Sequence, residues 1–451
     1  MSLKKGEGYT KTLLKRAKGS LLEVSIDQDV PVPTMTLLSP HTQQIRCLVF
    51  GRNHWEGIRK FSEANLGPLP LLCTLRVSSI GADEDDQPTI TPPSYPFFAE
   101  ATNVEEFVFN SRTFQFLNHF IFPALTTFRL RMQEVARSKA SDFFDFLKAS
   151  PMLQTVSIHI SVGIMLEDVP QEMVVTLPNV ETFSLTSDGK NTYDVTVHLS
   201  CPHARDVSLT SEVIELDISP SWEIFPAPVP WNTIIHHYMG SPVEEVTLEI
   251  QAFYEPCSLT FWSSDTSTIK LVFQLFLLSD DEDSELDIGF NEIFCEAFSQ
   301  GLGTIRNHPL LRNVKRLHIR CRDFGCTGFQ TWLLVTEIES IFEGLGPLET
   351  LTICGCNLYL YLAGFSELGN MKEPIVFPHI RHLTISHPSM EGSKDEYMDA
   401  IVDLTKSQHA RGMPFERVTV RAESLPAVME ERLRQWVSVM DCCEEDPPVE
   451  D

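Results

Sequence analysis

The segment Pro151-Met-Leu-Gln-Thr-Val-Ser-Ile158 decides the fold, because similar segments recur along most of the chain. In each copy an apolar residue stands two positions after the proline, and two further apolar residues follow three and five positions later. Copies with this spacing lie at residues 70–77, 123–130, 178–185, 202–209 and 378–385. Copies that are one residue shorter or lack the proline lie at 21–26, 44–50, 104–109, 242–248, 314–319, 347–353 and 414–420. Recurrence of one short pattern indicates a repeat protein.

The first apolar position of each copy recurs at nearly even spacing. Successive copies lie 21 to 32 residues apart between positions 21 and 204, and 32 to 35 residues apart between positions 314 and 415. These periods are typical of one supersecondary unit repeated along a solenoid. The register is less regular between 204 and 314, where residues 213–218 and 269–275 are two further predicted strands.

Strand and helix patterns alternate along the chain. The last two apolar residues of each copy flank one polar residue, which predicts a strand with one buried face. Proline cannot donate a ladder hydrogen bond, so it marks the place where the strand begins. Upstream, a period near 3.6 predicts helices at residues 141–150, 291–299, 332–342, 394–407 and 425–440. Ser141 is a predicted N-cap, and Gly344, Gly346 and Gly412 are predicted helix stops.

Repetition of helix, turn and strand predicts the fold class. We expect an α/β solenoid with a parallel sheet on the concave face and helices on the convex face. The predicted organisation is an N-terminal capping helix at 1–20, an irregular solenoid at 21–424, a C-terminal capping helix at 425–441 and an acidic tail at 442–451.

The composition excludes several classes of protein. Contents of 43% hydrophobic and 22% charged residues exclude a disordered or collagen-like chain, and a net charge of −27 disfavours nucleic acid and anionic membranes as partners. The opening residues lack the apolar segment of a secretory signal, and the apolar run at 271–278 is too short to span a bilayer. The 11 cysteines have no disulfide-framework spacing, so we expect reduced thiols and a cytoplasmic or nuclear location.

Motifs for catalysis or metal binding are weak. The sequence contains no recognisable catalytic or cofactor-binding motif, so we predict no enzyme, catalytic residue, metal ligand or cofactor. Residues 281–292 place acidic side chains as a calcium loop does, but Leu286 stands where the turn requires glycine. The residues His318, Cys321, Cys326, Cys354 and Cys356 do not have the spacing of a structural zinc site. Buried thiols at strand ends are the interpretation that we favour.

The copies resemble leucine-rich repeats, whose core is Leu-x-x-Leu-x-Leu, with frequent Val, Ile and Phe replacements. The asparagine that usually follows the strand is missing from most copies. Residues 13–26, 39–48, 146–156 and 177–185 resemble the repeat region of large fungal F-box-type proteins, and the resemblance extends over about residues 9–421. It implies an irregular leucine-rich-repeat-like solenoid.

In the family that the chain resembles, an N-terminal F-box docks a cullin ubiquitin-ligase adaptor and the repeats hold the substrate. Residues 1–20 are too few for an F-box, and residues 425–436 are interpreted as a capping helix although they imitate an F-box start. We therefore expect a substrate-recognition arm, with the cullin adaptor as a partner only if an F-box is supplied elsewhere, for example by an upstream exon.

Candidate partner-binding residues occupy the outward positions of the predicted strands. They are unusually basic for an acidic chain and comprise Arg76, Arg129, His159, Arg316, His318, Arg320, His382, Arg417 and Arg421. Extended concave faces are the usual binding surfaces of solenoids, and arginine is enriched at interfaces. The alternative is that these are scattered, solvated side chains.

Three functional hypotheses remain open from the sequence. The first is a non-catalytic module that binds an unidentified protein on the concave sheet face, and the second is a stand-alone scaffold unrelated to ubiquitination. The third is a carbohydrate-active parallel β-helix enzyme, which would need acidic pairs on one sheet face. Predicted helices, and outward positions richer in Arg, His, Ser and Thr than in carboxylates, argue against the third.

Overall fold

The computed structural model describes parts of the chain that include helices, strands and many of the turns between them. The described residues are 3, 7–27, 30–51, 54–78, 98, 101–111, 114, 117–132, 137–161, 165–167, 174–187, 189–214, 243–250, 257–263, 268–276, 309–321, 347–354, 379–386, 394–421, 427–437 and 439–443. The chain is α/β with mostly parallel strands and forms two compact units, Met1–Glu212 (the N-terminal unit) and Val213–Asp451 (the C-terminal unit). The division falls inside the region 21–424 that the sequence analysis treats as one solenoid.

The N-terminal unit contains a sheet of parallel strands paired in chain order. Its strands are β1 (Leu22–Ile26), β2 (Ile45–Phe50), β3 (Thr74–Ser78), β4 (Glu106–Ser111), β5 (Thr127–Met132), β7 (Thr155–Ile160), β10 (Thr182–Ser187) and β12 (Asp206–Ile214). Two short parallel pairs stand apart from this sheet: β6 (Arg137–Lys139) with β8 (Met165–Glu167), and β9 (Val175–Thr176) with β11 (Leu199–Ser200).

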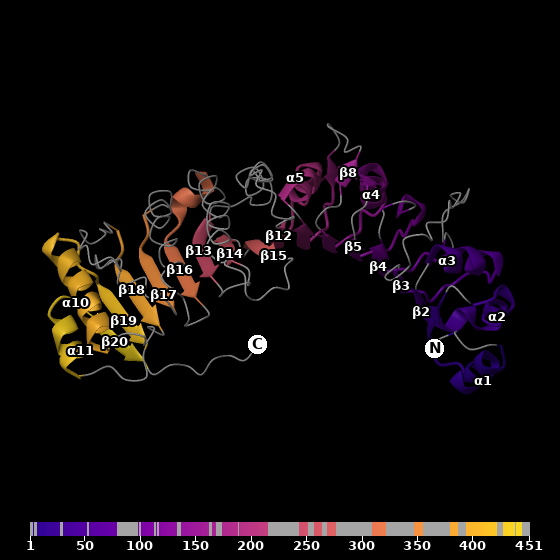
Figure 1. Ribbon diagram of the computed structural model, residues 1–451, viewed down its shortest axis with the longest axis horizontal. Helices are drawn as coiled ribbons and strands as arrows, with labels where there is room; N and C mark the ends of the chain where they lie inside the picture. Colours follow the sequence, from indigo (N-terminus) through magenta and orange to yellow (C-terminus); the bar gives the residue numbers. More distant parts are fainter. Residues whose placement is uncertain are drawn as a thin grey trace, which may run out of the picture. The chain divides into compact units, whose positions relative to one another are not determined.

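Helices connect successive strands of the N-terminal unit and lie along one side of them (Figure 1). They are α1 (Glu7–Ala17), α2 (Val32–Thr36), α3 (His54–Glu63), α4 (Ala140–Lys148) and α5 (Gly189–His198), with 3-10 turns η1 (Ser39–Gln44) and η3 (Leu117–His119). The predicted helix at 141–150 is α4, although it begins at Ala140, so Ser141 lies inside the helix and is not its N-cap.

The C-terminal unit begins with antiparallel strands and continues with parallel ones. Its strands are β13 (Val243–Ile250), β14 (Cys257–Ser263), β15 (Thr268–Phe276), β16 (Arg316–Cys321), β17 (Thr350–Cys354), β18 (His382–Ser386), β19 (Arg417–Arg421) and β20 (Val439–Cys443). The described helices are α10 (Lys394–Ala410) and α11 (Ala427–Arg434), with the 3-10 turn η4 (Pro309–Asn313). The strand order is β15-β14-β13-β16-β17-β18-β19-β20.

A tight turn precedes the strands that carry the repeated proline. The N–H of Leu153 donates to the carbonyl of Ser150, with Pro151 in the second turn position. The same bond is made by the N–H groups of Leu72, Leu125, Val180 and Ala204, each to the carbonyl three residues earlier. Proline suits this position because its φ angle is already that of the turn. The proline therefore marks the turn, and the strand begins a few residues later.

Neighbouring repeats are joined by shared carbonyl groups. The N–H groups of Gln154 and Thr155 both donate to the carbonyl of Thr126, at 2.8 and 2.9 Å. The carbonyls that accept two N–H groups in the same way are those of Cys73, Glu105, Gln154, Glu181, Lys315, Glu349 and Arg381. Asparagine also joins repeats, since Nδ2 of Asn103 donates to the carbonyl of Pro70 at 2.7 Å and Nδ2 of Asn179 to that of Pro151 at 3.0 Å.

The core of the N-terminal unit is built around phenylalanine. Phe107 on β4 is fully buried and packs against five other rings, with centroids 4.9 to 5.8 Å away. These rings belong to Phe109, Phe120, Phe122, Phe128 and Phe146. The α4 residue Phe146 also lies 4.6 Å from Phe128 on β5, so helix and sheet share one apolar layer.

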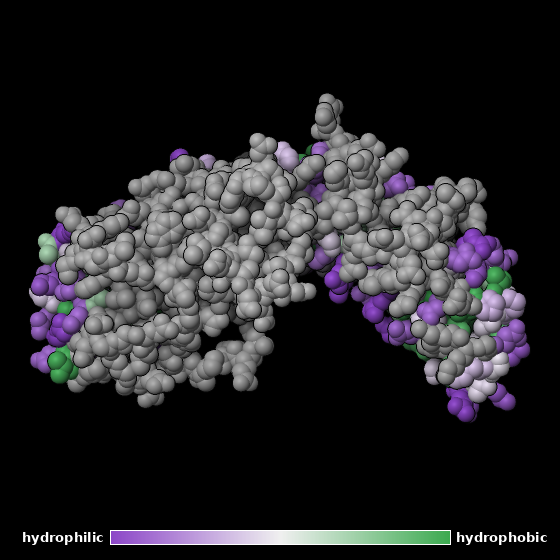
Figure 2. Space-filling view, viewed as in Figure 1, coloured by the Kyte–Doolittle hydropathy of each residue, from purple (hydrophilic) through white to green (hydrophobic). Residues whose placement is uncertain are grey.

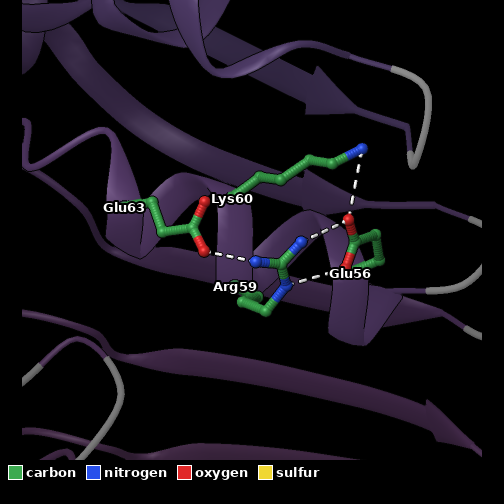
Figure 3. Close-up of polar contacts among 4 residues, drawn as sticks. All are labelled: Glu56, Arg59, Lys60 and Glu63. Carbon is green, nitrogen blue, oxygen red and sulfur yellow. Dashed lines mark hydrogen bonds and ion pairs between the residues drawn. The ribbon is translucent and has the colours of Figure 1, made fainter. Parts of the chain in front are cut away.

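The outer side of α3 is a solvated charged surface. The guanidinium of Arg59 donates to both carboxylate oxygens of Glu56, at 2.8 and 2.7 Å, and also pairs with Glu63, while Lys60 lies 3.4 Å from Glu56 (Figure 3). The hydrogen bonds from Arg59 lower the pKa of Glu56. Pairs at this spacing stabilise a helix by only about 0.2–0.5 kcal/mol each. Figure 2 shows purple, hydrophilic residues over much of the coloured surface of the N-terminal unit, with smaller green areas between them.

Two sequence predictions are wrong in the C-terminal unit. The sheet is not parallel throughout, because β13, β14 and β15 pair antiparallel. The connections at 251–256 and 264–267 are too short for a parallel crossover, which needs about a dozen residues or more. The predicted helix at 425–441 ends at Arg434, and Val439–Cys443 form β20, paired parallel with β19. This last strand satisfies ladder groups of β19 that would otherwise remain at an open edge.

Other predictions agree with the structure or fall outside it. The helix at 394–407 is α10, and Gly412 follows it with a φ angle of +77°, as expected of a helix stop.

Among the described thiols, Cys201 is buried, which raises its pKa to about 12, whereas Cys47, Cys73 and Cys354 are partly exposed. The helices predicted at 291–299 and 332–342, Gly344, Gly346, residues 281–292, Cys326, Cys356 and the tail from 444 onward lie outside the described residues. None of the described helices is long and apolar enough to cross a membrane.

Candidate binding face

Strands of the main sheet whose side chains are described divide them between two faces of the sheet. In β7 the residues Val156, Ile158 and Ile160 are buried, whereas Thr155, Ser157 and His159 between them are partly exposed. The buried face receives the helices, since Phe50 of β2 packs on Phe61 of α3 and Phe128 of β5 packs on Phe146 of α4. The opposite side, which we call the open face, carries polar side chains.

From β2 to β12, parallel pairing without a register shift arranges the open face of the N-terminal unit in rows. The first row contains Thr74, Glu106, Thr127, Thr155, Thr182 and Asp206. The second contains Arg76, Val108, Arg129, Ser157, Ser184 and Ser208. The third contains Ser78, Asn110, Arg131, His159, Thr186 and Thr210. Strands in a ladder lie about 4.8 Å apart, so neighbours in a row are close enough to act together.

The predicted residues Arg76 and Arg129 share one carboxylate. They occupy the second row on either side of Val108, and Glu106 in the first row lies 3.8 Å from Arg76 Nη2 and 3.9 Å from Arg129 Nε. Both arginines are about half exposed or more, so these contacts contribute little stability. The pair therefore holds one net positive charge near Glu106, less than the sequence alone suggests.

His159 lies beside Arg131, which was not among the partner-binding residues predicted from the sequence. The two residues are in register on β7 and β5, and Nε2 of His159 lies 3.5 Å from the hydroxyl of Ser161. Burial, and then the positive charge of Arg131, lower the pKa of His159. At neutral pH this site is therefore an uncharged imidazole next to an exposed guanidinium.

The C-terminal unit repeats the arrangement in rows. Its first row contains Glu245, Arg316, Thr350, His382 and Arg417. Its second row contains Thr247, His318, Thr352, Thr384 and Thr419. Its third row contains Glu249, Arg320, Cys354, Ser386 and Arg421. The six predicted residues of this unit thus lie on one face, with Arg316, His382 and Arg417 in the first row, His318 among threonines in the second, and Arg320 and Arg421 in the third.

Carboxylates lie beside two basic residues of the first row, Arg316 and His382. Arg316 Nε donates to Glu245 at 2.7 Å, and His382 Nε2 lies 3.9 Å from Glu416, which also pairs with Arg381 at 3.3 Å. Nε2 of His318 lies 3.4 Å from the other Glu245 oxygen without hydrogen-bond geometry, and among the described residues this buried atom has no hydrogen-bond partner. Glu245 is therefore the centre of a small charged cluster at one edge of the parallel strands.

His318 makes the C-terminal unit sensitive to acid. Burial is the main cause that lowers its pKa below the ordinary 6.5, and Arg320 and Arg316 lower it further, while Glu245 opposes them. Because the unfolded chain takes up this proton at a higher pH than the folded chain, stability is full above about pH 7 and falls as pH drops through 6. We expect His318→Gln to flatten the dependence of the urea midpoint on pH between about 7.5 and 5.5.

The control for this pH effect is Glu245→Gln, which removes the group that favours the charged imidazole. It is expected to steepen the loss of stability on acidification. Amide hydrogen exchange in β16 localises the change to this unit. Equal pH dependence in the wild-type chain and in His318→Gln would contradict the assignment.

Some residues that lie beside the predicted ones on the open face were not predicted from the sequence. Arg131 follows Arg129 at the alternate position of the same strand, so the period of two was the available signal. Glu106 and Glu245 also occupy outward positions, but only the pairing of strands distant in sequence shows which cations they contact. Across the described residues, no group of His, Cys, Asp and Glu is arranged to hold a metal ion.

Comparison with protein-family models and with curated protein sequences found no match to the chain.

Proposed function

We propose that the chain is a non-catalytic protein-binding module whose open sheet faces recognise another protein. The observation that supports this function is the registered array of outward Arg, His, Ser and Thr side chains, which are only partly buried on the side away from the core. Polar rows on a rigid sheet are pre-organised, so binding orders few additional groups. Arginine supplies directional hydrogen bonds at such surfaces.

We also propose that the fold is a leucine-rich-repeat-like solenoid. Chain-order parallel pairing and the shared carbonyls between repeats support this fold. Helices are about 10 Å wide whereas strands lie about 4.8 Å apart, so repeats of this kind bend towards their strands. The open faces would then be concave and the helices would lie on the convex side, as in the substrate-recognition arm of F-box-type ubiquitin ligase receptors.

Two alternatives differ from this proposal in testable ways. A stand-alone scaffold would use the same open faces without a cullin adaptor, and ligase assembly would require an F-box supplied by another segment or partner. A carbohydrate-active enzyme would need two carboxylates facing the same sugar. The described carboxylates Glu106 and Glu245 instead contact arginines, which favours binding over acid–base chemistry.

Charge reversal on the open face tests the proposed function. We expect Arg316→Glu with Arg320→Glu to weaken capture of a protein partner from native lysate by about tenfold or more, a loss of about 1.4 kcal/mol or more. The fold should remain intact because both side chains are exposed. The measurement is a tagged pull-down with quantitative mass spectrometry at low and high salt.

A matched control changes the same charge elsewhere in the C-terminal unit. Arg312→Glu with Lys406→Glu alters exposed residues of η4 and α10, outside the open face, and should leave capture unchanged. Co-purification of a cullin adaptor would favour the ligase arm, and a stable partner without it would favour the scaffold. Unchanged capture by the open-face variant would remove this surface from consideration.

A further inference from the structure

The third row of the C-terminal unit presents two separated guanidinium groups. Arg320 on β16 and Arg421 on β19 stand in the same row, with Cys354 and Ser386 on the two strands between them. Both arginines are exposed. Within the described part of the chain, no ion pair or hydrogen bond engages either guanidinium, in contrast to Arg316, which is held by Glu245.

The distance between these two arginines matches the distance between side chains at positions i and i+4 of an extended peptide. Three strand spacings of about 4.8 Å separate the backbone positions of Arg320 and Arg421 by about 14 Å. Four residues of extended chain cover about 13 Å, and side chains at i and i+4 point to the same side. Carboxylates at these two positions of a peptide that crosses the strands would therefore meet both arginines.

The surroundings of the row also suit a peptide. The side chains between the two arginines are small, since Cys354 is partly exposed and Ser386 is buried. The second row alongside presents the partly exposed hydroxyls of Thr352, Thr384 and Thr419, which can donate to carbonyl or carboxylate oxygens. A peptide lying over this row would contact small side chains along its length, a guanidinium group at each end and threonine hydroxyls on one side.

We propose that the open face of the C-terminal unit binds an extended acidic peptide whose carboxylates at positions i and i+4 engage Arg320 and Arg421. This inference rests on the proposed function and specifies its partner class. Charge complementarity supports binding of an acidic peptide, because each guanidinium can form paired hydrogen bonds with a carboxylate. The net charge of −27 does not prevent such binding, since charges beyond about 8 Å are largely screened at physiological salt.

A nucleic acid strand is also anionic but fits this face less well. Proteins that bind single strands combine cations with aromatic side chains on which the bases stack. The outward positions of β16 to β19 carry Arg, His, Thr, Ser and Cys, with no Phe, Tyr or Trp.

The test compares two labelled nonapeptides of identical composition on the full chain. One has glutamates at positions 3 and 7 in a Thr/Val/Ser background, and the other has them at positions 3 and 6, where they point to opposite sides. Fluorescence anisotropy should show at least about tenfold tighter binding of the first peptide. Arg320→Glu and Arg421→Glu should each weaken it by at least about tenfold, whereas Arg312→Glu should not. Unchanged hydrogen exchange in β16 and β19 confirms that the variants fold.

The following results would overturn the proposal. Equal binding of the two peptides would show that carboxylates at positions i and i+4 are not required. Unaltered binding to Arg421→Glu would show that Arg320 and Arg421 do not act as a pair. Displacement of the peptide by a single-stranded oligonucleotide with equal affinity and the same arginine dependence would favour nucleic acid. If no peptide binds but pull-down still depends on Arg316 and Arg320, the peptide class is wrong and the proposed function stands. If pull-down is also unaffected, both are wrong.

Discussion

Replacement of Phe107 by alanine is expected to lower the free energy of unfolding of the N-terminal unit by about 3–5 kcal/mol. Phe107 is fully buried on β4 and contacts the rings of Phe109, Phe120, Phe122, Phe128 and Phe146. The rings come from strands, from helix α4 and from the segment before β5. Truncation therefore removes dispersion contacts with several elements at once and leaves a cavity that no single side chain can fill.

The appropriate measurement is amide hydrogen exchange in β4 and β5, because a chain with two units need not unfold in one step. Phe107→Leu serves as the control, since a smaller change of volume is expected to cost less than the alanine variant. A loss of less than about 1 kcal/mol in Phe107→Ala would contradict the central place of this ring in the core.

Replacement of Leu351 by aspartate is expected to destabilise the C-terminal unit by at least about 4 kcal/mol. Leu351 is 1% exposed in the middle of β17, and it is in register with Leu317 on β16 and Leu383 on β18. A carboxyl group placed between these leucines loses its hydration and gains no described cation on the buried face. The apolar contacts of the leucine are lost in addition.

The neighbouring position provides a matched control. Thr352 follows Leu351 on the same strand but points to the open face, between His318 and Thr384. Thr352→Asp introduces the same charge and should change stability by no more than about 0.5 kcal/mol. Hydrogen exchange in β17 and β18 measures both variants. Similar losses for the two substitutions would mean that the strand does not separate a buried face from an open one.

Short-range patterns predicted individual elements well. The alternation in Val156-Ser-Ile158 predicted both the strand β7 and the face that it buries, because a period of two follows directly from strand geometry. The helices at 140–148 and 394–410 were predicted to within a few residues for the same reason. The repeated proline was predicted to mark the beginning of the strand, but it lies in the preceding turn, from Ser150 to Leu153 in this repeat, and β7 begins at Thr155.

Elements that depend on neighbours in the sheet were predicted less well. Residues 439–441 were assigned to a helix and residues 442 and 443 to an acidic tail, but pairing with the edge of β19 makes residues 439–443 a strand. The direction of β14 and β15 follows from the short connections around them, which the repeat pattern did not consider. In both cases the decisive interactions are hydrogen bonds to another strand, and periodicity within one segment does not contain them.

For the candidate binding face too, the sequence predicted local features and strand pairing decided the rest. By itself the sequence determined which side chains point outward, because Arg316, His318 and Arg320 alternate with buried residues on one strand. Only the tertiary structure decided which charges meet. It places Glu106 between Arg76 and Arg129, holds Arg316 against Glu245, and aligns Arg320 with Arg421, about a hundred residues later in the chain. The physical reason is register, since the pairing of distant strands sets the distance between side chains and therefore the charge that each can offer to a partner.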